Sequence, residues 1–165
     1  MKKFLLTFIC CLALPAAAFA YNANDVQQVQ SGISCPGADL SGADLSGLNL
    51  NGARLADTDL SGADLQNANM HRAVFKNCTL TKANLSGADL SYANLSGNKL
   101  DKAVLNNAVL YRTGLRGADL NYASFAYAKL QEATLDKANA QNADFSYADL
   151  TLTDFGRAFK DNAKF

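Results

Sequence analysis

Large apolar residues recur at every fifth position from Leu40 to Phe155 without an insertion. Of these 24 positions, 18 are Leu, four are Phe, and the other two are Met70 and Ala140. A second column lies two residues before the first, and 18 of its 24 members are Ala. The residue between the columns is often Asp or Asn, and Gly recurs two residues after the large apolar residue. A fixed period of this kind indicates a repeat architecture.

A period of five residues fits neither an α-helix nor a plain strand. Five residues turn an α-helix by about 500°, so successive Leu would spiral around it, and an odd period sends alternate Leu to opposite faces of a strand. The pattern instead predicts a short extended piece with Ala and Leu pointing inward, followed by a tight turn of Asn, Asp, Ser and Gly. Four such pieces would close a coil, and the 24 pentads predict six coils stacked about 4.8 Å apart.

The tandem motif A-[D/N]-L-x-x, as in Ala43-Asp44-Leu45 and Ala63-Asp64-Leu65, resembles the pentapeptide repeat family. The resemblance covers residues 33–155. It implies an all-β fold, the right-handed quadrilateral β-helix of that family, here a solenoid of about six coils. It says little about function, because the family includes gyrase-protecting DNA mimics, secreted effectors and many proteins without an assigned activity.

Residues 20 apart should stack in columns inside such a coil. The column that begins at Leu45 reaches Phe125, Phe145 and Phe165, which predicts a core that changes from Leu to stacked Phe toward the C-terminus. Lys160 continues the register but is ill suited to an apolar interior. We therefore expect the coil to end near residue 155.

Both ends of an open β-helix need covering, because its edges present unpaired backbone groups. We predict an N-terminal cap over residues 21–32, with a short helix at residues 24–30. Residues 156–165 would form a C-terminal cap or a dimer segment. Three aromatic residues would either fold over the last coil or form a seam between two copies: Phe155, Phe159 and Phe165.

The first 20 residues have the organisation of a secretory signal peptide. Two lysines precede an apolar run over residues 4–14, and the small residues Ala18 and Ala20 occupy the positions that signal peptidase reads. The run is too short to cross a hydrocarbon core of about 30 Å. Cys10 and Cys11 would suit a lipoprotein, but the residues before them are large. We expect cleavage after Ala20 and a periplasmic or secreted chain, with no transmembrane segment after processing.

Three residues interrupt the inward Ala column at positions 20 apart: Thr58, Cys78 and Asn98. Buried polar groups are normally hydrogen-bonded, so we interpret them as an interior polar ladder bonded to the backbone or to one another. A reactive thiol is the competing interpretation, which an enclosed Cys without a cationic neighbour disfavours. Cys35 would lie about two rungs from Cys78, roughly 10 Å away and beyond the reach of a disulfide.

Carboxylates stack along the outside, as in Asp39 over Asp59 and Asp44 over Asp64. Calcium needs six to eight converging oxygens, which a flat wall does not offer, so turn capping is the favoured role of these residues. We expect no metal and no cofactor.

One outer wall combines cations with aromatic rings. Arg above Tyr at the spacing of one rung permits cation–π stacking, and both residue types are enriched at binding surfaces. Ordinary variation of an exposed wall is the competing interpretation. A second pair, Tyr127 and Tyr147, should stack on the adjacent wall. The candidate interaction patch comprises His71, Arg72, Tyr92, Tyr111 and Arg112.

These features favour a non-enzymatic exported scaffold or interaction protein that presents its walls to a protein or envelope partner. The chain has one His, and an uninterrupted rod has no cleft in which catalytic groups could converge. The alternatives are a DNA-mimic inhibitor of a topoisomerase and a secreted effector. The 15 acidic and 15 basic residues balance, and loss of the two lysines at the start leaves a charge of −2, so DNA mimicry and nucleic-acid binding are disfavoured. A homodimer through the C-terminal end is a further option.

Overall fold

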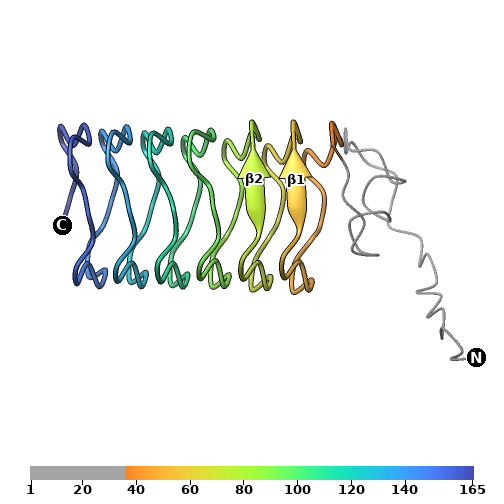
Figure 1. The fold of residues 1–165 in the computed structure, drawn as a ribbon, viewed down its shortest axis with the longest axis horizontal. Helices are drawn as coiled ribbons and strands as arrows, with labels where there is room; N and C mark the ends of the chain where they lie inside the picture. Colours follow the sequence, from red (N-terminus) through yellow and green to blue (C-terminus); the bar gives the residue numbers. More distant parts are fainter. Residues whose placement is uncertain (1–35) are drawn as a thin grey trace, which may run out of the picture.

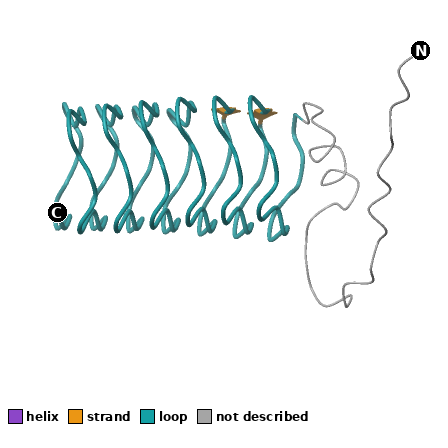
Figure 2. Cartoon of the chain, turned by 90° about the horizontal axis from the view of Figure 1, so that it is seen from below, coloured by secondary structure: helices purple, strands orange, loops and turns teal. Residues whose placement is uncertain are grey.

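The computed structural model describes residues 36–165, which form one continuous stack of coils (Figure 1). Its two regular strands are β1 (Arg54–Ala56) and β2 (Val74–Lys76), which pair in parallel. The same parallel pairing recurs as single bridges between residues 20 apart, from Asp39 with Asp59 to Asp144 with Lys164. Figure 2 shows the stack from below, with turns and short extended pieces making up the rest. Each coil therefore contains four pentads.

Backbone hydrogen bonds between successive coils repeat with every pentad. The Leu40 N–H donates to the Asp59 carbonyl at 2.7 Å, and the Asp59 N–H donates to the Ala38 carbonyl at 2.9 Å. Within the turn that follows, the Ala43 N–H donates back to the Leu40 carbonyl at 3.0 Å. Each rung is thereby tied to both of its neighbours, which is how stacked repeats gain stability.

The corner after each large apolar residue places one residue in the left-handed region of φ. At the described corners this residue has a φ between +54° and +74°, apart from an irregular corner near the C-terminus where Gly156 has a φ of +33°. A type II turn has such a φ at its third residue, where Gly is favoured. Yet 17 of these corner residues are not Gly, including Tyr92 and Leu152. The coil thus imposes a conformation that costs an L-residue about 1 kcal/mol.

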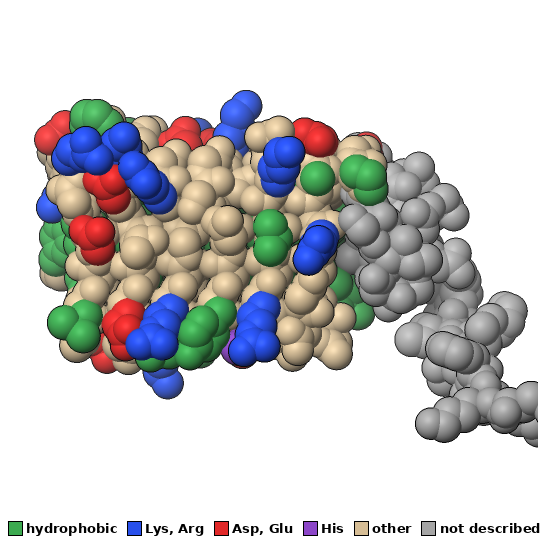
Figure 3. All heavy atoms as spheres, in the orientation of Figure 1, with side chains coloured by type: hydrophobic (Ala, Val, Ile, Leu, Met, Phe, Trp, Pro, Cys, Tyr) green, Lys and Arg blue, Asp and Glu red, His purple; other side chains and the backbone are tan. Residues whose placement is uncertain are grey.

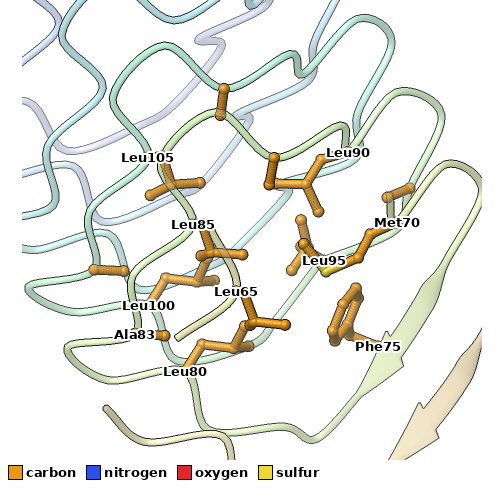
Figure 4. Packing of buried hydrophobic residues seen from close by; sticks show 14 of the residues in the cluster. Leu65, Met70, Phe75, Leu80, Ala83, Leu85, Leu90, Leu95, Leu100 and Leu105 are labelled. Carbon is orange, nitrogen blue, oxygen red and sulfur yellow. The ribbon is translucent and has the colours of Figure 1, made fainter. Parts of the chain in front are cut away.

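The two inward columns fill the interior. Every fifth residue from Leu40 to Phe145 is buried, and Figure 4 shows such side chains converging from successive rungs. The ring of Phe145 stacks on Phe125 at a centroid distance of 4.9 Å and on Phe165 at 5.5 Å. The predicted change from a Leu core to a stacked Phe core is confirmed.

The coil continues past Phe155, where we expected it to end. The bridge between Asp144 and Lys164 keeps the register through residues 156–165. Lys160 occupies a Leu-type position, but its side chain is exposed, with Nζ 5.2 Å from the centroid of the Phe155 ring. The expectation failed because no described coil covers this position, so the lysine does not have to be desolvated.

Three predictions lie outside the described residues. They concern the signal peptide at residues 1–20, the capping helix within residues 21–32, and Cys35. Among residues 36–165, no helix is long and apolar enough to cross a membrane.

Candidate functional site

The predicted interaction patch forms a ladder of touching rings on one wall. The His71 ring meets the Tyr92 ring edge-on at a centroid distance of 5.4 Å. Tyr92 in turn meets Tyr111 edge-on, also at 5.4 Å and at an interplanar angle of 89°. These residues come from corners of successive coils, so the backbone register fixes their spacing. The edge-to-face geometry is a favourable arrangement for aromatic pairs.

Charged groups continue the ladder toward the C-terminus. The Arg112 Nε donates to Glu132 Oε2 at 2.7 Å, and the Tyr111 hydroxyl donates to Glu132 Oε1 at 2.9 Å. The Arg112 guanidinium also lies 5.1 Å from the centroid of the Tyr111 ring. The hydrogen bond from Arg112, followed by that from Tyr111, lowers the pKa of Glu132. The same hydrogen bond to Glu132 raises the pKa of Tyr111.

The structure joins four of the five predicted patch residues and adds one. Glu132 completes the ladder, and its place after Arg112 in the same column could have identified it. Arg72 is exposed and makes no ion pair within residues 36–165. The cation–π contact joins Arg112 to Tyr111 and not to Tyr92, because Glu132 holds the guanidinium on the side of Tyr111. We use the name aromatic ladder for His71, Tyr92, Tyr111, Arg112 and Glu132.

A second pair of rings lies on the adjacent wall. Tyr127 and Tyr147 stack with a centroid distance of 5.0 Å and an interplanar angle of 9°. Both side chains are exposed, and Tyr147 is 79% exposed. Each ring covers one face of the other, so Tyr147 keeps most of its surface open to the solvent.

The interior polar ladder is buried and hydrogen-bonded. The Asn98 side chain accepts the Cys78 N–H at 2.7 Å and donates to the Phe75 and Ser96 carbonyls, each at 3.1 Å. The Thr58 hydroxyl donates to the Ala56 carbonyl at 3.2 Å. No buried side-chain polar atom of the described residues lacks a partner. The arrangement is one of structural support.

Cys78 is a free, buried thiol. Its Sγ lies 3.4 Å from the Leu55 carbonyl, and burial raises the pKa of the thiol. A raised pKa disfavours the thiolate, which is the reactive form. Sequence reasoning missed a further buried polar residue, Thr113, which donates to the Leu90 carbonyl at 2.8 Å. Thr113 lies in the Ala column, two residues before Leu115, and this position alone would have predicted its burial.

The C-terminal end forms an apolar surface. Phe155 meets Phe145 and Phe165 edge-on, at centroid distances of 5.6 and 5.7 Å. Phe159 and Phe165 are each more than half exposed. The aromatic residues predicted for a cap or a dimer seam therefore lie on the last coil itself, and two of them face the solvent.

The stacked carboxylates act within their own turns. Asp39 Oδ1 accepts the Ser41 N–H at 3.1 Å, and Asp44 Oδ1 accepts the Ser46 N–H at 3.0 Å. Hydrogen bonds from the Ser46 hydroxyl and N–H lower the pKa of Asp44. Within residues 36–165, no group of three or more His, Cys, Asp or Glu residues could hold a metal ion.

A family model describing pentapeptide repeats matches residues 38–77, 58–97, 68–107, 88–121 and 118–157. The chain belongs to the pentapeptide repeat family. Membership in the pentapeptide repeat family agrees with the five-residue period and the β-helix-type solenoid. Pentapeptide repeat proteins are in general structural or interaction proteins and not enzymes.

Several solved pentapeptide repeat structures are similar to this chain. HetL, involved in heterocyst differentiation regulation in the cyanobacterium Nostoc sp. strain PCC 7120, is 27% identical over 81% of this chain and 85% of its own, with a TM-score of 0.39. A protein from the thylakoid lumen of Arabidopsis thaliana is 25% identical over 76% and 78%, with a TM-score of 0.40. The plasmid-mediated fluoroquinolone resistance protein QnrB1 is 14% identical over 79% and 73%, with a TM-score of 0.47. No curated protein sequence matches the chain.

Proposed function

We propose that this protein is a non-enzymatic, exported interaction protein that presents one wall of its β-helix to a protein or envelope partner. The observation that carries the proposal is the aromatic ladder, whose five side chains touch one another on successive coils of a single wall. We take the repeat to be a right-handed quadrilateral coil of about six rungs, so each wall is a regular surface for docking.

The contacts within the ladder favour its use in binding. Tyr92 is 43% exposed, yet it is held between the rings of His71 and Tyr111. Ordering a free side chain on binding costs about 0.5–1.5 kcal/mol, and a side chain that is already held avoids much of this cost. Tyr and Arg are also the residues that most often dominate interface energies.

A matched pair of double variants tests the proposal. Arg72→Glu with Tyr92→Ala alters the proposed wall, and Lys102→Glu with Tyr122→Ala makes the equivalent change on another corner. In both pairs the cation precedes the tyrosine by 20 residues, and all four residues have a φ between +57° and +60°. The pairs therefore match in charge, ring loss and backbone conformation.

The measurement is recovery of crosslinked partners from the envelope and extracellular fractions of cells that make each full-length variant. We expect the Arg72/Tyr92 variant to lose partners that the wild type and the Lys102/Tyr122 variant retain. Retention of every partner by the Arg72/Tyr92 variant would refute the proposed wall.

Export is the second part of the proposal, supported by the sequence of residues 1–20. Fractionation of cells that express a C-terminally tagged full-length chain should place a shortened protein in the periplasm or the medium. Full-length protein confined to the cytoplasm would contradict export and return DNA mimicry to consideration.

The exposed rings of Phe159 and Phe165 on the last described coil favour a homodimer. The N–H groups of Leu150 and Phe155 donate no hydrogen bond within residues 36–165, and Phe165 beside them is 62% exposed. Unpaired edges of this kind pair readily with another chain. We propose that two copies meet at this end and bury Phe159 and Phe165. Size-exclusion chromatography with light scattering should detect the dimer, and a monomer at every concentration would exclude it.

A further inference from the structure

The charges of the coil are unevenly distributed among its walls. The wall that carries β1 and β2, taken with both of its corners, holds seven of the 13 Lys and Arg residues within residues 36–165 but only four of the 14 Asp and Glu residues. The rest of this region holds six cations and ten anions. We name this wall the basic face; it comprises residues 51–57, 71–77, 91–97, 111–117, 131–137 and 151–157.

The basic face has a net charge of +3, and the other three walls, counted with both corners in the same way, have +1, 0 and −2. Figure 3 shows Lys and Arg side chains gathered along the two long edges of the rod, with a mostly neutral strip between them. The aromatic ladder lies along one of these two edges. An electropositive wall on an otherwise acidic rod attracts a negatively charged partner.

On each corner of the basic face, two of the cations are separated by the same interval. Arg72 and Arg112 lie on one corner, and Lys76 and Arg116 lie on the other, 40 residues apart in each case. Since each coil takes 20 residues, both pairs are two rungs apart, about 9.6 Å. Between the corners, the outward column begins with Arg54 and Val74 and ends with Asp154, and only its three middle members are small and uncharged: Asn94, Gly114 and Thr134.

Part of this positive charge is not neutralised within the protein. Glu132 pairs with Arg112, and Asp136 pairs with Arg116 and Arg157. Arg72, Lys76 and Lys137 form no ion pair within residues 36–165. These three cations lie on both edges of the basic face and are available to a ligand.

We propose that the basic face binds a linear anionic polysaccharide whose carboxylates recur at regular intervals. The proposal rests on the proposed function, since it names the class of envelope partner. The equal spacing of the Arg72–Arg112 and Lys76–Arg116 pairs suits an extended polymer of repeated charge, for which Arg112 and Arg116 would have to exchange their contacts with Glu132 and Asp136. The rings of His71 and Tyr92 provide apolar surface at the edge of the face, against which the C–H groups of sugars can pack.

The charge balance disfavours a nucleic acid as the polymer. Nucleic-acid-binding domains typically have a pI above about 9, whereas the pI of this chain is about 6.5. Glu132 and Asp136 also lie on the basic face, where closely spaced phosphates would meet them. A polyuronate has a lower charge density and tolerates interspersed carboxylates.

The experiment measures binding of the full mature chain to alginate, a linear polyuronate, by affinity electrophoresis. Dextran, a neutral glucan, and a mixed-sequence DNA duplex are the comparison ligands. We expect retardation by alginate that weakens as salt screens the charges, and none by dextran. Absence of retardation by alginate at low salt would overturn the proposal, and so would tighter binding to the duplex than to alginate.

Two double charge reversals locate the site. Arg72→Glu with Lys137→Glu changes both edges of the basic face, whereas Lys82→Glu with Lys102→Glu changes a corner outside it. All four residues have a φ between +57° and +63°, and Glu132 adopts a φ of +57°, so glutamate is accommodated at such corners. The first variant should bind alginate at least about tenfold more weakly, equivalent to 1.4 kcal/mol, and the second should bind as the wild type does.

Equal weakening by both double variants would overturn the proposal, because it would indicate attraction by overall charge. The polysaccharide proposal can fail without the proposed function failing. A wall that crosslinks a protein partner but does not bind alginate would refute the polysaccharide and leave the interaction wall standing.

Discussion

The first and last described coils share a backbone but differ in their side chains. Up to residue 62, five of the six described corner residues with left-handed φ are Gly, whereas beyond Gly117 the only such Gly within the described residues is Gly156, at the irregular corner. The core changes in parallel, from Leu in the first coils to the stack of Phe125, Phe145 and Phe165 in the last.

This difference shows how one repeat serves two purposes. A Gly corner adopts left-handed φ without steric cost, but it presents no side chain to the solvent. A corner such as Tyr92 or Arg112 carries the conformational cost and places a ring or a guanidinium on the wall. The corner that carries the aromatic ladder is Gly52 in the first coil and a non-Gly residue from Arg72 to Glu132, so the conformational cost and the exposed side chains coincide along this corner.

The largest expected effect comes from the Phe core. Phe145→Ala removes a ring that contacts Phe125, Phe155 and Phe165, and it should lower the free energy of unfolding by about 3–5 kcal/mol. Leu65→Ala, in the same column but within the Leu-filled coils, should cost about 3 kcal/mol. Urea denaturation followed by circular dichroism measures both. A smaller loss for Phe145→Ala than for Leu65→Ala would show that the last coils contribute little to stability.

The interior polar ladder should be the next most sensitive feature. Asn98→Ala leaves the Cys78 N–H and the Phe75 carbonyl without their partner and should cost about 1–3 kcal/mol. The exposed Asn51→Ala serves as the control, expected to change stability by less than about 0.5 kcal/mol. The same denaturation experiment measures both. Equal stability of the two variants would mean that the hydrogen bonds of Asn98 do not stabilise the fold.

Substitutions at the corners test whether a residue other than Gly costs stability at a left-handed φ. Gly62→Ala introduces a Cβ that meets no atom, so its cost should be that of left-handed φ alone, about 1 kcal/mol. Gly87→Ala should cost slightly more, because the Asn67 side chain would have to turn away from the new Cβ. The reverse change, Leu152→Gly, should not destabilise the protein. A clear loss of stability for Leu152→Gly would contradict the cost assigned to these corners.

The smallest effect concerns the thiol of Cys78. Because burial raises its pKa, the folded protein keeps this proton at a pH where the unfolded chain has lost it, so stability falls as the pH rises through the ordinary thiol range. At pH 8, Ellman's reagent should react far more slowly with Cys78 in the native protein than in urea. Equal rates would show that these coils open readily.

Much of the architecture follows from the sequence because a five-residue period leaves little choice of register. Once Leu40 is placed inside, the column of Phe125 and Phe145 and the burial of Asn98 follow from counting in twenties. The stacking of Tyr127 on Tyr147 follows in the same way. For exposed residues, the sequence predicts which of them lie in the same column, because the backbone fixes where each side chain begins.

The direction of long side chains was not predictable. Arg112 could reach either Tyr92 or Tyr111, and the hydrogen bond to Glu132 decides between them. Lys160 led to the wrong expectation that the coil ends near residue 155. The periodic pattern alone does not reveal that this inward position in the last described coil is exposed to the solvent.

Site-specific photocrosslinking tests most directly whether one wall of the coil makes the functional contact. A benzophenone amino acid placed at Tyr92 or at Tyr122 samples two exposed corner tyrosines with the same φ, within about 2° of each other, on different walls. We predict crosslinked adducts from position 92 and none from position 122 in intact cells. Adducts of equal yield from both positions, or from position 122 alone, would contradict the aromatic ladder as the binding wall.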